Sequence, residues 1–229
     1  MAQLTAAHVL AQLQSGQSLA RAELSHLNLS QQCLDGGDFS GAYLRRATLQ
    51  GSSCQAVDFS LATLVLADLS GGDLTAACLT DASLIQAQLP HAKLQGAIAA
   101  SAKLHGANLT GVDARQANFN GADLRSVTAP QCRFDHASLV GARLEEANFS
   151  QSSFTGARLS RTAWMGATLM GVAFAGAGLA QAKFSKALLL GANFSEADLL
   201  RCDLSEADLT GAVLRSTQMD WADLWHAVL

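Results

Sequence analysis

The chain has 229 residues, of which 49% are hydrophobic and 15% are charged, and its formal net charge is −4. This composition excludes an intrinsically disordered chain and the strongly basic surface typical of nucleic-acid-binding proteins. Five cysteines without a C-x-x-C spacing exclude a disulfide framework and a zinc ribbon, and they favour a reducing compartment such as the cytoplasm.

Residues 1–18 predict a short helix that precedes the main body of the chain. Thr5 is a suitable N-cap for a helix from about Ala6 to Ser15, and Gly16 can end it. Its apolar positions, which include a hydrophobic staple, are Leu4, Val9, Leu10 and Leu13. We expect this segment to cover one end of a second unit, residues 19–229, with a recognition or targeting helix as the alternative.

From Leu24 to Leu229 every fifth residue is apolar. Of these 42 positions, 27 are Leu and nine are Phe, and the exceptions are Cys54, Ala99, Ala114, Ala129, Trp164 and Met219. The residue two positions earlier is Ala in 28 of the 42 cases, and 15 of the 19 glycines lie two positions later. We call these three positions the centre, the slot and the turn position of a five-residue unit.

A period of five fits neither regular secondary structure. On an α-helix, successive centres would be rotated by about 140° and would form no stripe, and on a flat strand they would alternate between faces. A short extended step followed by a bend in every unit lets both the centre and the slot point inward. Glycine at the turn position suits a bend with positive φ, and the remaining positions face water.

Several units have a recognisable sequence, such as A-N-L-T-G at Ala107–Gly111, A-D-L-T-G at Ala207–Gly211 and A-N-F-S-E at Ala192–Glu196. With these units the chain resembles the pentapeptide-repeat family. The resemblance implies an all-β fold, a right-handed quadrilateral β-helix with four units per coil. About ten coils at about 4.8 Å each would make a rod roughly 50 Å long.

Surface charge supports a 20-residue period independently of the resemblance. Sorted by this period, the side built on Leu29 to Leu229 carries only Asp68 and Asp208, whereas the side built on Leu24 to Leu224 carries 14 charged residues. The nearly uncharged side also contains Pro90 and Pro130. Because proline lacks a backbone N–H, we expect the hydrogen-bond ladder to be interrupted at these two residues.

One segment has the length of a membrane span. Residues Thr162 to Ala182 comprise 21 residues without a charge. The segment contains four glycines, and the five-residue pattern runs through it without a break. The repeat therefore predicts that this segment belongs to the rod and does not cross a membrane.

The sequence offers no constellation for chemistry. No two of the six histidines have metal-ligand spacing, and no histidine is placed beside a serine or cysteine to form a triad. Cys54 occupies a centre, and Cys132 and Cys202 occupy slots, so we expect all three to be buried, whereas Cys33 and Cys78 face outward. We predict no catalytic residue, no cofactor and no metal, and hence no enzyme.

Interaction surfaces are the remaining candidates. Apolar residues at outward positions form the first set: Val65, Ile85, Met165, Met170, Leu188, Leu190 and Leu200. Apolar residues of the last coil, candidates for a cap or a dimer contact, form the second: Trp221, Trp225, Val228 and Leu229. Acidic residues near the C-terminus form the third: Glu196, Asp198, Asp203, Glu206, Asp208, Asp220 and Asp223.

Two functions follow from these surfaces. The first is a protein–protein interaction scaffold, a rigid rod that presents flat faces to another protein. The second, implied by the resemblance, is a DNA mimic that binds DNA gyrase or topoisomerase IV as a dimer joined through the C-terminal coils. DNA of 50 Å carries about 30 phosphate charges, whereas this chain has 19 acidic and 15 basic residues. We expect no direct contact with nucleic acid or membrane.

Overall fold

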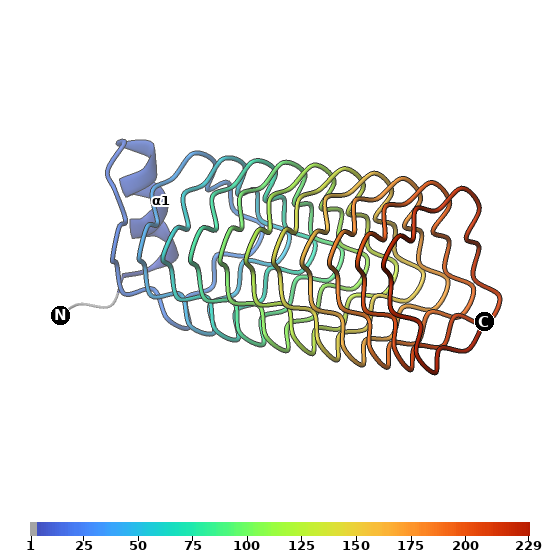
Figure 1. The fold of residues 1–229 in the computed structure, drawn as a ribbon. Helices are drawn as coiled ribbons and strands as arrows, with labels where there is room; N and C mark the ends of the chain where they lie inside the picture. The colour runs from blue at the N-terminus through green and yellow to red at the C-terminus, as the bar shows by residue number, and fades with distance from the viewer. Residues whose placement is uncertain (1–3) are drawn as a thin grey trace.

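The computed structural model describes residues 4–229, which form a rod of stacked coils with the helix α1 (Ala6–Gln14) at one end (Figure 1). Every bridge between neighbouring segments is parallel and joins residues 20 positions apart, from Glu23 with Tyr43 to Asp208 with Val228. Each coil therefore contains four five-residue units. Within the described residues each unit contributes one bridged residue and no extended strand, so four narrow columns of bridges run along the rod.

The backbone hydrogen bonds explain why five residues suffice for one unit. The N–H of the centre Leu44 donates to the Thr63 carbonyl in the next coil (2.8 Å), and the Tyr43 N–H donates to the Ala22 carbonyl in the preceding coil (2.9 Å). A turn then closes when the Ala47 N–H donates to the Leu44 carbonyl (3.0 Å). Each unit thus bonds to both neighbouring coils and bends once.

The residue directly after each centre has an N–H outside this backbone pattern. An Asp or Asn directly before the centre often supplies the acceptor. Asn148 Oδ1, for example, accepts from the Ser150 N–H (3.0 Å) and the Ser150 hydroxyl (2.7 Å). This local bond explains why units of the form A-N-L or A-D-L recur, since the short polar side chain pairs a backbone group that the coil leaves free.

All 42 turn positions, from Arg21 to His226, have positive φ between 52° and 70°. Glycine occupies 15 of them, and 27 carry other residues, including Leu61 and Trp221. Glycine removes the local steric cost of this conformation. The turn itself is imposed by the coil, because residues with side chains adopt it at most positions.

The expected interruption of the ladder at the two prolines is wrong. The Gly71 N–H donates to the Pro90 carbonyl, and the Gly111 N–H donates to the Pro130 carbonyl, both at 2.9 Å. Each proline directly follows a centre, where the N–H has no backbone partner in any unit, so its absence costs nothing. The residue directly after the centre is also position i+1 of the turn, where proline's fixed negative φ is favoured.

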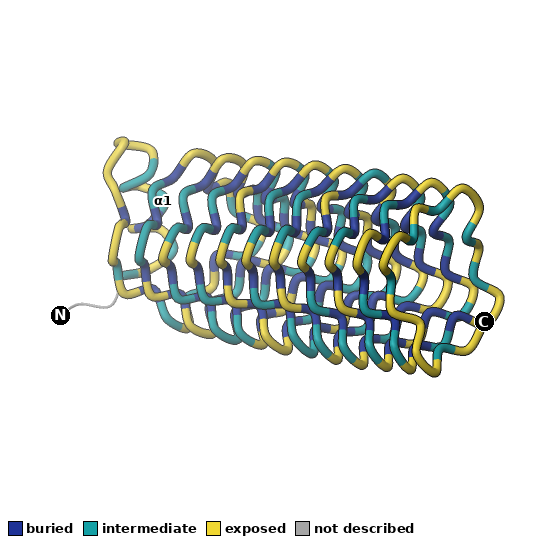
Figure 2. Tube along the Cα trace, in the orientation of Figure 1, coloured by how far each residue is buried: buried dark blue, intermediate teal, exposed yellow. Residues whose placement is uncertain are grey.

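The core consists of the centres and slots. Figure 2 shows buried residues recurring along the whole rod, and all nine phenylalanines are fully or almost fully buried. The rings of Phe134, Phe154, Phe174 and Phe194 stack one coil above another, with centroids 5.1–5.4 Å apart. Each alanine centre precedes a phenylalanine centre by one coil, so small and large side chains alternate in Ala99–Phe119, Ala114–Phe134 and Ala129–Phe149.

Trp164 is the largest buried side chain, with no exposed surface. Its Nε1–H donates to Thr162 Oγ1 (2.7 Å), and the Thr162 hydroxyl donates to the Leu159 carbonyl (2.6 Å). Thr162 occupies the slot of the same unit and is also fully buried. The polar slot therefore satisfies the one polar group that a tryptophan brings into an otherwise apolar core.

The helix α1 covers the N-terminal end of the rod. Thr5 caps it, accepting from the His8 N–H (3.3 Å), and the His8 ring accepts from the Thr5 N–H (3.4 Å). Val9 is fully buried against the first coils, and Leu4, Leu10 and Leu13 pack beside it. Gly37 occupies a slot, where most units have alanine. A Cβ at this residue would lie 2.7 Å from Leu13 Cδ2, so glycine leaves room for the helix.

Residues 162–182 form part of the rod, as the repeat predicted. Their centres Trp164, Leu169, Phe174 and Leu179 are fully buried. Among residues 4–229, the structure contains no helix with the length and apolar character of a membrane span.

Candidate interaction surfaces

The rod has four sides, each built on one column of centres. The charged side, on the Leu24–Leu224 column, carries 14 charged residues, and the neutral side, on the Leu29–Leu229 column, carries Asp68 and Asp208. The ladder side is built on the Leu34–Leu214 column, and the fourth side on the Phe39–Met219 column. The sequence thus places charge unevenly around the rod.

Exposed apolar side chains gather on the neutral side in the C-terminal half. Met170 and Leu188 are 44% and 43% exposed, and Leu190 is half-buried beside them. Leu188 is bridged to Thr168 and Asp208 in the same column. Met165 lies at the adjoining corner, on the charged side. These four residues form an apolar surface that crosses neighbouring coils.

The remaining members of the first candidate set lie elsewhere. Leu200 belongs to the fourth side, which faces away from the neutral side, and is 38% exposed. Val65 and Ile85 are half-buried and lie on the charged side in the N-terminal half of the rod. The structure therefore separates the set that the sequence grouped by hydrophobicity alone.

The last coil exposes its apolar residues. Trp221 is 84% exposed, Trp225 62%, Val228 55% and Leu229 76%. These residues do not share one side of the rod. Trp221 lies on the fourth side, Trp225 lies on the charged side, and Val228 and Leu229 lie on the neutral side. Within the described residues, the backbone N–H groups of the centres Leu214, Met219 and Leu224 have no backbone acceptor. This end of the rod thus offers both apolar side chains and free backbone groups.

The acidic residues of the C-terminal coils are distributed around the rod. The charged side holds Asp203, Glu206 and Asp223, the fourth side Asp198 and Asp220, the ladder side Glu196, and the neutral side Asp208. Asp203 and Asp223 are direct neighbours in one bridge column. Glu206 lies 3.8 Å from Lys186 Nζ. The seven carboxylates therefore form no continuous acidic face.

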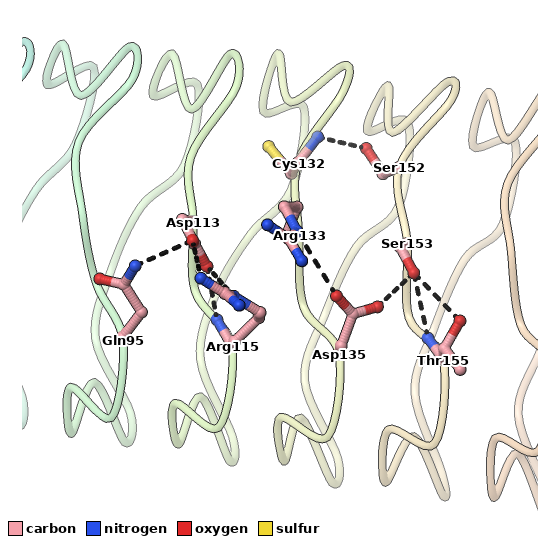
Figure 3. Close-up of polar contacts among 9 residues, drawn as sticks. All are labelled: Gln95, Asp113, Arg115, Cys132, Arg133, Asp135, Ser152, Ser153 and Thr155. Atoms are coloured by element: carbon pink, nitrogen blue, oxygen red, sulfur yellow. Dashed lines mark hydrogen bonds and ion pairs between the residues drawn. The ribbon is translucent and has the colours of Figure 1, made fainter.

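Figure 3 shows a polar network on the ladder side that the repeat pattern alone does not predict. Gln95 Nε2 donates to Asp113 Oδ2 (2.8 Å), and Arg115 binds the same carboxylate through Nε (2.8 Å) and Nη2 (2.6 Å). In the next coil Arg133 and Asp135 are 3.7 Å apart. The available signal was the pair of residues that flank a centre, Asp113 with Arg115 and Arg133 with Asp135.

One turn on the neutral side departs from the common pattern (Figure 3). The Cys132 N–H, which would ordinarily close the turn onto the Ala129 carbonyl, donates to Ser152 Oγ in the next coil (2.9 Å). The Ser152 hydroxyl in turn donates to the Ala129 carbonyl (2.9 Å). A buried serine in the neighbouring slot thus completes the turn that begins with Pro130.

The rod surface carries shallow hollows. One of about 340 Å³ is lined by Gln95, Arg115, Gln116, Asp135 and His136. Another of about 270 Å³ lies on the charged side and is lined by His105, Arg125, Ser126, Arg143, Glu145 and Glu146. Residues 4–229 contain no group of three His, Cys, Asp or Glu side chains arranged to hold a metal ion.

The model of the family described as pentapeptide repeats matches eight copies, in residues 22–53, 42–81, 77–116, 117–156, 131–163 and 187–225. The chain belongs to the pentapeptide-repeat family. The membership agrees with the 20-residue coil, and the family fold is a right-handed β-helix. No curated protein matches the chain.

Solved pentapeptide-repeat structures are similar to this chain. One is HetL, a protein involved in heterocyst differentiation regulation from the cyanobacterium Nostoc sp. strain PCC 7120, with 25% identity over 99% of this chain and 95% of HetL and a TM-score of 0.46. Another is QnrB1, a plasmid-mediated fluoroquinolone resistance protein, with 20% identity over 84% of this chain and 89% of QnrB1 and a TM-score of 0.48.

The ladder side predicts an acid-sensitive component of stability. Burial alone would raise the pKa of Asp113, but the hydrogen bonds and charge of Arg115 hold that pKa below its ordinary value. A carboxylate with a lowered folded-state pKa stabilises the fold above the unfolded-state pKa, and this contribution is lost as the pH falls through the folded-state pKa. We expect Asp113→Asn to lower the urea concentration at the midpoint of unfolding at pH 7. When the pH is lowered below about 4, the midpoint of the variant should fall less than that of wild type, because the variant has no Asp113 carboxylate to protonate.

Asn148→Ala is the control for this measurement, because it removes a turn hydrogen bond but no titrating group. It should lower the urea midpoint by a similar amount at pH 7 and pH 3. An unchanged acid response in Asp113→Asn would contradict the assignment.

The five thiols of this pentapeptide-repeat chain should differ sharply in reactivity. Burial raises the pKa of Cys54, Cys132 and Cys202 to about 12, whereas Cys33 is exposed and Cys78 half-buried. Because the thiolate is the reactive form, iodoacetamide at pH 8 should modify Cys33 first and Cys78 more slowly. Peptide mapping by mass spectrometry should find the other three modified only after urea unfolding, and their modification in the folded chain would contradict the burial.

Proposed function

We propose that this chain is a non-enzymatic scaffold that binds another protein along the neutral side of the rod. The observation that carries the proposal is the apolar surface of Met165, Met170, Leu188 and Leu190 beside a column with two charged residues. Exposed apolar surface that spans neighbouring coils is typical of protein contact sites. The rigid coil presents it without a conformational change, and no cofactor is required.

The test is a pair of charge-introducing variants. Leu188→Glu combined with Met170→Glu places two carboxylates in the proposed contact, whereas Ile98→Glu alters an equally exposed bridge residue on the fourth side. Affinity chromatography with quantitative mass spectrometry should identify a protein that wild type and Ile98→Glu retain and the double variant loses. If the three chains retain the same proteins in equal amounts, the neutral side is not the contact. Equal melting temperatures verify the fold.

A type II topoisomerase is the alternative partner. Residues 191–229 carry seven acidic and two basic residues, so the C-terminal coils are the most acidic part of the rod. Their distribution over four sides and the small total charge favour the scaffold instead. A gyrase supercoiling assay separates the two: inhibition by the purified protein, or protection from a quinolone, supports the DNA mimic, and the absence of both excludes it.

We also propose that two copies associate through the C-terminal coils, in the cytoplasm. The support is the exposure of Trp221 and Trp225, which would be buried in such a contact. Sedimentation of wild type and of Trp221→Ala with Trp225→Ala tests it. The wild type should have the mass of a dimer and the variant a lower association constant, and equal masses at all concentrations would overturn the contact.

A further inference from the structure

The charged side has a charge balance that the other sides lack. It carries seven acidic and seven basic residues, so its net charge is zero. One continuous bridge column runs along it from Glu23 to Asp223 in ten steps. The nine steps from Tyr43 to Asp223 span about 43 Å at about 4.8 Å per coil. The two ends of this column differ in net charge, because Glu23, Arg45 and Arg46 at one end sum to +1, whereas Asp203, Glu206 and Asp223 at the other sum to −3.

The exposed aromatic residues follow the same axis. All nine phenylalanines and Trp164 are buried, whereas Tyr43 is 50% exposed and Trp225 62% exposed. Both lie on the charged side, near its opposite ends, and Trp221 lies in the same coil as Trp225, at the corner between the fourth and charged sides. One end therefore combines a phenol with two guanidinium groups, and the other combines indoles with carboxylates. Guanidinium groups bind both indole faces and carboxylates.

We propose that the charged side pairs with the charged side of a second copy, antiparallel, about a twofold axis. This inference rests on the proposed self-association, but it places the C-terminal coil of each copy against the N-terminal coils of the other copy and not against the other C-terminal coil. Because both complementary ends lie on one side of one chain, a twofold pairing makes each contact twice. In the proposed register Tyr43 lies opposite Asp223, and Arg45 lies opposite Trp225.

The middle of the charged side fits the same register. The axis then passes between the bridged neighbours Asp123 and Arg143. Within each chain Arg125 is paired with Asp123 at 2.6 Å, and Arg143 with Glu145 at 3.4 Å. Asp123 of one copy lies opposite Arg143 of the other, and Arg125 lies opposite Glu145, so the two pairs of one copy would meet those of the other in one network. Glu145 Oε2 is buried and is an acceptor without a hydrogen-bond partner among the described residues. A basic group from a second copy, facing the hollow that Glu145 lines, would supply favourable charge there.

The remaining bridge residues place no two like charges opposite one another. Thr63 lies opposite Asp203, Ser83 opposite Lys183, and Lys103 opposite Ala163 in this register. Like charges at such positions would oppose pairing. The neutral side remains uncovered, so a paired rod could still bind the partner proposed above.

Charge reversal with rescue tests the pairing. Arg45→Glu with Arg46→Glu, and separately Glu206→Arg with Asp223→Arg, should each weaken the dimer by about tenfold or more, measured by sedimentation equilibrium at low salt. All four substitutions in one chain should restore the dissociation constant to within about threefold, since the two neighbouring ends again carry opposite charge. Arg158→Glu with Arg215→Glu, two exposed residues on the fourth and ladder sides, is the matched control and should leave the constant unchanged.

The outcomes separate this inference from the proposed self-association. A dimer that withstands both charge reversals but is lost in Leu229→Glu joins the rods end to end, which overturns the side-by-side pairing and keeps the association. A wild type that is monomeric at every concentration overturns both. Two charge reversals that weaken the dimer without mutual rescue also overturn the register, because the basic end of one copy is then not beside the acidic end of the other.

Discussion

A Trp164→Ala variant is expected to lose about 3–5 kcal/mol of unfolding free energy. Trp164 contacts four buried rings, those of Phe149, Phe154, Phe174 and Phe184, with centroids 5.5–5.9 Å away. Removing the indole leaves a cavity that the bonded coils on both sides cannot close. Urea unfolding monitored by circular dichroism measures the loss.

The chain supplies a matched control for this substitution. Trp225→Ala is the same chemical change at a residue that is 62% exposed, and surface substitutions of this kind usually change stability by less than about 0.5 kcal/mol. It should be measured at a concentration where both chains are monomeric. Equal losses in the two variants would show that the Trp164 site is not tightly packed.

The alanine centres show why the loss depends on context. Ala99, Ala114 and Ala129 are native centres, so alanine at this position is compatible with the coil. Each has a phenylalanine centre one coil later in its own column, and all these residues are buried. The native sequence therefore offsets a small centre with a large neighbour. Trp164→Ala would also have a phenylalanine, Phe184, one coil later in its column. This ring and the others around Trp164 already pack against one another, so none is free to fill the space of the indole.

The period of five was enough to predict the core, because burial at the centres and slots follows from backbone geometry alone. A unit that bends every five residues must direct the same two side chains inward each time, whatever their identity. The sequence could not predict which polar groups pair between coils. Gln95 with Asp113, or Ser152 with the turn at Pro130, depends on side-chain rotamers and on distances between residues about 20 apart.

The interaction surfaces were only partly predictable for a related reason. A 20-residue period assigns each outward residue to a side, which is how the neutral and charged sides were distinguished. Hydrophobicity alone grouped Leu200 with Leu188, although they lie on sides that face away from each other. The fold tolerates many residue types at the outward positions, so these residues can be selected for binding. Which of them form one surface follows only from their arrangement in space.

Different sides also allow separate tasks on one rod. The neutral side has exposed apolar residues and little charge, which suits contact with another protein, whereas the charged side has balanced charges suited to a second copy. Both the ladder side and the charged side also pair charges within the chain, since Arg115 with Asp113 and Arg125 with Asp123 are each paired at 2.6 Å. Substitutions that change one kind of contact should therefore leave the others unchanged, as the control variants above assume.

A Thr162→Val variant is expected to lose about 1–3 kcal/mol, because the buried Trp164 Nε1–H is left without an acceptor. Valine fits the slot, as the buried Val57, Val112 and Val172 show, so the change removes a hydroxyl and creates little strain. Thr162→Ser keeps the hydroxyl and should lose less.

The decisive comparison places the same change in a Trp164→Phe background. Phenylalanine has no N–H to satisfy, so Thr162→Val should cost less there, and the two substitutions should show a coupling energy of about 1–2 kcal/mol in a double-mutant cycle of urea unfolding. Equal costs in the two backgrounds would mean that the 2.7 Å bond from Trp164 to Thr162 adds nothing to stability. Coupling would show that a polar slot is retained in this apolar column because its centre is a tryptophan.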